Sequence, residues 1–166
     1  MRTILRSGLI VLVSAGLFGG CAGKSKFQDK MKGLWVLESR TLSDGSKIVP
    51  PAISGRLEWF PMDVDAETAH VSILTTHGDS DLQISGAHYD IEGTDRFISK
   101  SYLEVGGGLS KTPDKGFLAK KTTDNGTITV DATKITFQHG KGHSFVFEGS
   151  RLTIRHQDGT MDVLLK

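Results

Sequence analysis

The amino-acid sequence predicts an all-β protein, an antiparallel meander that closes into a barrel of eight to ten strands. From Gly33 onward, apolar and polar residues alternate with a period of two; Ile135 and Phe137, for example, flank Thr136. Such alternation is typical of strands with one buried face. Asp-Gly, Glu-Gly and Asn-Gly pairs separate the alternating segments and favour tight turns. A meander of this length leaves two long edges exposed unless it closes, so we expect a barrel ahead of a sandwich.

Residues 1–20 have the pattern of a secretory signal peptide. Arg2 and Arg6 give a positive start, and an apolar stretch follows from Gly8 to Phe18. This stretch is too short to cross about 30 Å of hydrocarbon as a permanent helix. Its removal would take two of the 20 basic residues and leave 18 against 19 acidic ones, a net charge of −1. Such a charge offers no basic field, and we expect no nucleic-acid partner.

The segment Phe18-Gly19-Gly20-Cys21 contains the only cysteine of the chain and resembles the lipobox of bacterial lipoprotein precursors. The resemblance implies that Cys21 carries acyl chains, such as palmitate, which hold the protein on a membrane. Ala22 stands where the family's inner-membrane retention signal has an aspartate. The expected location is therefore the outer membrane, with the protein facing the periplasm. The alternative is a plain signal peptide followed by an incidental cysteine.

The remaining sequence predicts a lipidated tether over 21–32 and a barrel domain over 33–166. Within the tether, KFQDKMKG favours a single helical turn with Phe27 and Met31 on one side. Alternation and turn residues place the expected strands at 33–42, 54–61, 68–76, 84–92, 95–105, 116–123, 127–131, 134–139, 143–148, 151–157 and 160–165. The expected turn pairs are Asp44-Gly45, Glu92-Gly93, Asn125-Gly126, Glu148-Gly149 and Asp158-Gly159. The glycine-rich segment 106–116 is long for a hairpin and could be a lid over the barrel mouth or a linker.

A helical turn followed by Gly33-Leu34-Trp35, continuing as LWVLESRTLSDG, resembles the start of the calycin superfamily, the lipocalins and lipocalin-like bacterial domains. The resemblance implies a lipocalin-like barrel in which Trp35 closes the floor and packs beneath an arginine from a late strand. Arg155 is the expected partner and Arg151 the alternative. The Thr-Asp-Tyr loop, disulfide and C-terminal helix of the classical lipocalins are missing, so lipocalin-like domains are the better match. The other interpretation is that Trp35 is a core aromatic of a different β domain.

Inward aromatic residues would line a barrel pocket, and the candidates are Trp59, Tyr89 and Tyr102, which combine apolar area with a polar tip. Alternation does not show which face of each strand points inward, so core packing is the alternative for each.

The second candidate site is QHGKGHS, residues 138–144, where His139 and His143 could approach each other across a hairpin. With a carboxylate such as Glu148 as third ligand, they could hold a transition metal. No further ligand lies at a diagnostic spacing. A solvated, glycine-rich hairpin is therefore the favoured interpretation, and we expect no metal and no cofactor.

The sequence contains no nucleophile elbow, no His-Glu-x-x-His helix and no second cysteine, so we expect no enzyme. The favoured function is a membrane-anchored binding module that holds a small apolar or amphipathic ligand in the barrel. The alternative is an envelope lipoprotein with a filled barrel that acts on a protein partner as subunit or inhibitor.

Overall fold

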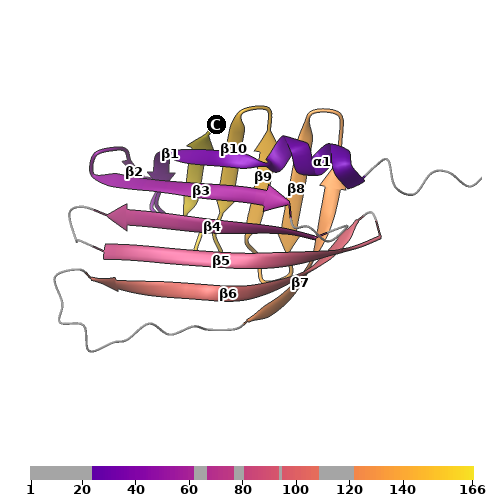
Figure 1. Ribbon diagram of the computed structural model, residues 1–166. Helices are drawn as coiled ribbons and strands as arrows, with labels where there is room; N and C mark the ends of the chain where they lie inside the picture. Colours follow the sequence, from indigo (N-terminus) through magenta and orange to yellow (C-terminus); the bar gives the residue numbers. More distant parts are fainter. Residues whose placement is uncertain (1–23, 62–66, 77–80, 94, 109–121) are drawn as a thin grey trace, which may run out of the picture.

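The computed structural model describes residues 24–61, 67–76, 81–93, 95–108 and 122–166. They form one short helix and a single antiparallel sheet (Figure 1). The elements are α1 (Lys24–Met31), β1 (Gly33–Thr41), β2 (Lys47–Ile48), β3 (Ile53–Pro61), β4 (Glu67–Thr76), β5 (Asp81–Glu92), β6 (Arg96–Gly108), β7 (Thr123–Val130), β8 (Lys134–His139), β9 (Ser144–Glu148), β10 (Arg151–Arg155) and β11 (Met161–Leu165).

The sheet closes into a barrel because its first and last strands pair with each other. Val36 of β1 lies opposite Leu165 of β11, and Thr41 lies opposite Met161. From β3 to β11, each strand pairs with the next along the chain, while the two-residue β2 pairs only with the end of β1. In Figure 1, β3 to β6 form one wall, and β8 to β10 form a second wall that crosses it steeply. This closed antiparallel barrel of ten strands confirms the predicted fold class.

Four of the five predicted turn glycines, at positions 45, 93, 149 and 159, have the positive φ that tight turns require. The fifth prediction was wrong, because Asn125-Gly126 lies inside β7, which is one continuous strand. A Cβ atom on Gly126 would lie 2.2 Å from Cζ of Phe97, on the neighbouring β6. Gly126 therefore makes room for an aromatic ring. The expected separate strand at 116–123 corresponds only to the start of β7, and residues 109–121 lie outside the described part of the chain.

Helix α1 lies at the barrel end where the chain enters β1 (Figure 1). Met31 is completely buried, and its carbonyl oxygen accepts a 2.9 Å hydrogen bond from Nε1 of Trp35. Nζ of Lys30 donates to the carbonyl of Ala132 in the β7–β8 turn, which fixes the helix to the wall. The helix confirms the predicted helical turn; the side chain of Phe27 lies outside the description. Among the described residues, no helix is both long and apolar enough to cross a membrane.

Aromatic side chains fill the interior next to α1. Trp59 is at their centre, stacked on Tyr89 with ring centroids 5.1 Å apart and in edge contact with Phe147 at 5.1 Å. Such offset and edge-to-face contacts add to the gain from burying apolar area. We call this group the aromatic cluster, and its members are Trp35, Trp59, Tyr89, Phe97, Phe137, Phe145 and Phe147.

Candidate functional site

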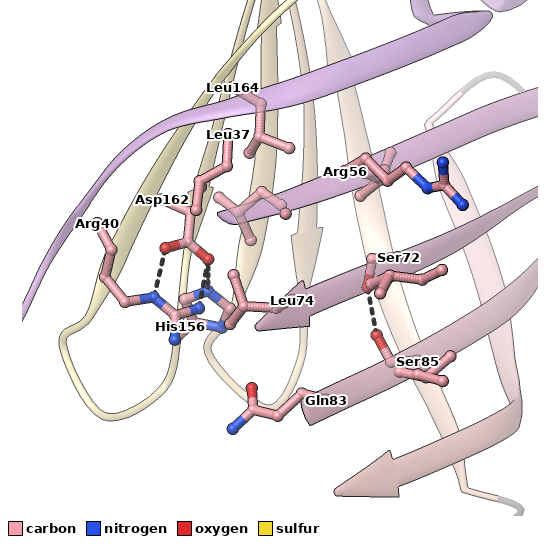
Figure 2. A pocket seen from close by; sticks show the side chains of 15 residues that line it. Leu37, Arg40, Arg56, Ser72, Leu74, Gln83, Ser85, His156, Asp162 and Leu164 are labelled. Atoms are coloured by element: carbon pink, nitrogen blue, oxygen red, sulfur yellow. Dashed lines mark hydrogen bonds and ion pairs between the residues drawn. The ribbon is translucent and has the colours of Figure 1, made fainter. Parts of the chain in front are cut away.

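Two adjoining cavities occupy the part of the interior that the aromatic cluster leaves open. The first has a volume of about 370 Å³ and lies against β3, β4, β5 and β11 (Figure 2). The second, of about 350 Å³, lies against β5, β6, β7 and the β8–β9 turn. Ser85, Ile154 and His156 line both cavities, so the two adjoin. Each volume lies near the lower end of the range for small-molecule sites, about 300–1,000 Å³.

Strand register explains why hydroxyl groups line the first cavity. Leu57 of β3 lies opposite Ser72 of β4, which lies opposite Ser85 of β5. Residues directly opposite each other in an antiparallel sheet share a face. Leu57 is buried in the core, so both serines point inward as well, and their Oγ atoms are 2.7 Å apart. The cavity wall thus presents a hydroxyl pair beside apolar side chains.

A charged network crosses the first cavity near the β10–β11 turn. Nε and Nη2 of Arg40 donate to the two carboxylate oxygens of Asp162, each at 2.6 Å, and Nε2 of His156 lies 2.8 Å from Oδ2 (Figure 2). Burial alone would raise the pKa of Asp162, but hydrogen bonds from Arg40 and His156 and their charges outweigh it and lower the pKa. The carboxylate therefore stays ionised inside the barrel, held in bidentate geometry.

Four histidines line the second cavity: His70, His139, His143 and His156. Burial, together with the nearby His139 and His143, lowers the pKa of His70 to about 3. Burial also lowers the pKa values of His139 and His143, although the charge of Asp124 opposes both shifts. Neutral imidazoles can each donate one hydrogen bond and accept another, or offer a nitrogen lone pair.

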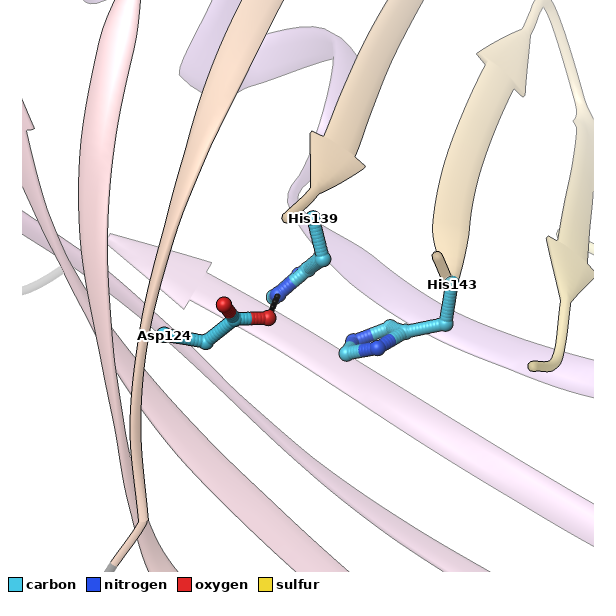
Figure 3. A group of neighbouring side chains, drawn as sticks. All are labelled: Asp124, His139 and His143. Atoms are coloured by element: carbon cyan, nitrogen blue, oxygen red, sulfur yellow. Dashed lines mark ion pairs between the residues drawn. The ribbon is translucent and has the colours of Figure 1, made fainter. Parts of the chain in front are cut away.

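The side chains of Asp124, His139 and His143 point toward one another (Figure 3). Oδ2 of Asp124 lies 3.4 Å from Nδ1 of His139, and the two imidazole rings stack with centroids 3.6 Å apart. The predicted approach of the two histidines across the hairpin is thus present. The turn that joins them is held by the hydrogen bond from His139 N to His143 O, and Gly142 adopts a φ of 94° within it.

Glu148, which was considered as a third ligand beside these histidines, does not lie near them. Glu148 is exposed at the far end of β9, opposite Lys134 at the start of β8. Asp124 lies beside the two histidines instead. It is two residues before Gly126 and shares its face of β7, and Gly126 lies opposite His139 on β8. The hairpin is also not wholly solvated, since the exposed fraction of His139 is only 3%.

The three predicted ligand-binding residues differ from one another in where they lie relative to the cavities. Trp59 is buried in the aromatic cluster, donates from Nε1 to Oγ1 of Thr68 at 2.6 Å, and lines neither cavity. Tyr89 is also fully buried, but it borders the second cavity. The side chain of Tyr102 lies outside the described residues. Of the two whose side chains the structure describes, Tyr89 borders a cavity and Trp59 does not.

A cation lies over the ring of Trp35, which is fully buried, but the cation is Lys166. Nζ of Lys166 lies 5.3 Å from the ring centroid of Trp35 and donates to the carbonyl of Lys32. Gly33, with a φ of 130°, leaves space for the lysine stem. The expected role of Arg155 was wrong: it is exposed and pairs with Met161, at the opposite end of β11 from Trp35.

The alternative, Arg151, lies beside Leu165 and forms a 3.9 Å ion pair with Glu38. It belongs to the outer surface.

A scan against protein-family models and a search of curated proteins find no match for this chain. The lipocalin-like resemblance and the lipobox therefore stay predictions, and Cys21 lies outside the described residues. Sequence reasoning missed the inward-facing polar residues Arg40, His70, Asp124, His156 and Asp162. Each of them is a polar residue on a strand face that is otherwise apolar. In a short alternating segment, such a residue looks the same whether it faces the interior or the solvent.

Proposed function

We propose that the protein is a membrane-anchored periplasmic binding module that holds a small amphipathic molecule in the two cavities. The observation that carries the proposal is the adjoining pair of cavities inside a closed barrel. Burial of apolar ligand surface there would contribute roughly 25 cal/mol per Å², offset by the cost of ordering the ligand.

The lining favours an amphipathic ligand over a purely apolar one. Leu37, Leu57 and Leu164 supply apolar surface to the first cavity, while Ser72 and Ser85 supply hydroxyl groups. Buried polar groups bind strongly only to a ligand that satisfies their hydrogen bonds. A hydrocarbon portion against the leucines and a polar group near the serines would match this wall.

Ligand binding is tested with purified protein by native mass spectrometry and by titration with a panel of fatty acids and lysophospholipids. Ser85→Phe would fill the region shared by both cavities and should weaken binding at least tenfold. The matched control is Thr129→Phe, on the exposed face of β7, which should leave binding unchanged. Circular dichroism establishes that both variants are folded. Absence of any co-purifying or added ligand in the wild type would contradict the proposal.

Membrane anchoring is proposed on the lipobox resemblance at Cys21 alone. Several acyl chains together hold a protein firmly, at about 0.8 kcal/mol per buried CH₂. Cells grown with labelled palmitate should incorporate the label into the wild type and not into Cys21→Ser. The variant should also leave the membrane fraction. An unlabelled wild-type protein would remove the anchor from the proposal without affecting the cavities.

A second candidate function, binding of an envelope protein, is favoured by an apolar patch on the outer wall. The patch consists of Leu34, Val36 and Leu165, whose exposed fractions are 48%, 54% and 40%. Val36 and Leu165 lie opposite each other where β1 meets β11. Contiguous exposed apolar residues often mark interaction sites. Cross-linking in intact cells should recover a partner that Val36→Lys loses, and failure with the wild type would exclude this function.

A further inference from the structure

We propose that Asp124, His139 and His143 form a binding site for a divalent transition-metal ion of the zinc class. The three side chains line the second cavity, but binding of the ion does not require the organic ligand proposed above, because all three donors belong to the protein. One aspartate oxygen and two imidazole nitrogens are a donor set that suits Zn²⁺, Co²⁺, Ni²⁺ or Cu²⁺ better than Mg²⁺ or Ca²⁺.

The three donors already lie close together. The nearest combination of one ligand atom from each side chain has all atoms within 4.8 Å of one another. Zinc binds nitrogen and oxygen at about 2.0–2.2 Å, so tetrahedral donors lie about 3.3 Å apart. Adjustments on the order of 1 Å would complete the geometry. These adjustments involve neighbouring segments, because β7 and β8 are adjacent and a turn joins β8 to β9 (Figure 3).

Charge at the site favours a cation. Within the described part of the chain, the carboxylate of Asp124 contacts the ring of His139 and the backbone N–H of Lys141. No described lysine or arginine side chain forms an ion pair with it. Nζ of Lys141 donates instead to the carbonyl of Thr123, at 3.4 Å. The carboxylate of Asp124 brings negative charge to His143, and the nearby Lys141 opposes it there.

A buried nitrogen supports the same assignment independently. Nε2 of His139 has no hydrogen-bond partner among the described residues, although the residue is 97% buried. Its Nδ1 faces Asp124 at 3.4 Å and Oγ of Ser99 at 3.5 Å. Buried polar atoms in folded proteins almost always have a partner. An ion bound by a nitrogen of this ring would give the buried imidazole a polar partner, with Asp124 as a ligand of the same ion.

The other imidazole–carboxylate pair in the interior lacks this capacity. His156 contacts Asp162, but Arg40 already occupies both oxygens of that carboxylate. A cation there would have to displace a buried guanidinium. The comparison identifies Asp124 as the carboxylate that is available to a metal, and the second cavity beside it leaves space for a water molecule or ligand atom in the fourth position.

The test uses purified protein without a histidine tag, stripped with EDTA and titrated with ZnCl₂ by calorimetry and with CoCl₂ by visible absorption. One ion per chain with micromolar or tighter affinity, and the intense cobalt bands of a four-coordinate site, are expected. Asp124→Asn and His143→Gln should each weaken binding at least tenfold. His88→Gln, the matched control on β5, should not.

Two results would overturn the site. One is a folded wild type that binds neither zinc nor cobalt at micromolar affinity. The other is binding that survives in both site variants. If those variants do not fold, imidazole nitrogen NMR of the wild type decides. Zinc should move the resonances of His139 and His143 among the six histidines of the chain, and movement of others alone would contradict the proposal.

Discussion

The two ends of the barrel interior are built from different side chains. Next to α1, Trp35 and Trp59 pack with phenylalanines at ring distances of 5.1–5.6 Å, and Lys166 covers the outside. Toward the β10–β11 turn, the interior holds cavities, histidines and the ion pair of Arg40 with Asp162. Close packing stabilises the first end, whereas polar groups at the second end are retained at some cost in stability. The difference indicates that the filled end supports the barrel, and it is the polar end to which the proposed ligand and metal ion are assigned.

The largest expected effect is on the free energy of unfolding, and it distinguishes the packing at the two ends. Trp59→Ala removes the centre of the aromatic cluster and should lower the free energy of unfolding by about 3–5 kcal/mol. Leu74→Ala borders a cavity, where fewer neighbours lose contacts, and should lower it by only about 1–2 kcal/mol. Urea denaturation measures both values. Equal losses would show that the two ends are packed alike.

The second effect tests the buried ion pair. Arg40→Met leaves Asp162, whose side chain is 6% exposed, with His156 as its remaining described partner and should lower the free energy of unfolding by about 3 kcal/mol. Arg151→Met is the matched control, because its pair with Glu38 is 3.9 Å long and half exposed. The control should change stability by less than about 0.5 kcal/mol. A similar result for both arginines would remove the argument for a charged interior.

The third effect is the pH dependence that His70 adds. Its pKa is about 3 in the fold against 6.5 for the ordinary group, so the unfolded state binds the proton first as the pH falls. The stability that neutral His70 contributes is therefore fully present above pH 6.5 and is lost as the pH drops toward 3. Between pH 7.5 and pH 5, this group should account for a loss of about 2 kcal/mol.

Denaturation of wild type and His70→Gln at both pH values measures this loss. The difference between the two pH values should shrink by about 2 kcal/mol in the variant. His88→Gln is the matched control and should keep the wild-type difference. An unchanged difference in His70→Gln would show that the histidine-lined end does not exclude water from this ring.

The smallest effect concerns the outer cover of the filled end. Lys166→Met removes the cation above Trp35 and should lower the free energy of unfolding by about 0.5–1 kcal/mol. Lys47→Met, on the two-residue β2, is the control and should have no measurable effect. Thermal unfolding at low and high salt measures both. A salt-independent loss would indicate that the lysine stem, rather than its charge, stabilises this end.

Most of the fold could be predicted from the sequence because its signals are local. Alternation placed nine of the ten wall strands close to their observed bounds, and four glycine turns were correct. β7 was divided wrongly because Asn-Gly favours a turn in any local context. Gly126 serves a contact with Phe97, a residue of another strand, and no local pattern carries that information.

The site was less predictable because it depends on register and on which face of each strand points inward. The hairpin brought His139 and His143 together as expected, since only three residues lie between them. Asp124 joins them through the pairing of β7 with β8, and no local pattern assigns that pairing to one register. The cation above Trp35 was assigned to Arg155 by resemblance, while its actual source, Lys166, follows from the pairing of β1 with β11.

The pairing of β1 with β11 also has a consequence for synthesis. Each strand from β3 to β10 can pair with its predecessor as the nascent chain lengthens, but β1 has its second neighbour only after residues 161–165 have left the ribosome. Until then, one edge of β1 and one edge of β10 can each accept a strand from another molecule. Premature termination after residue 160 would therefore yield a protein that forms most of its sheet and aggregates through those two edges.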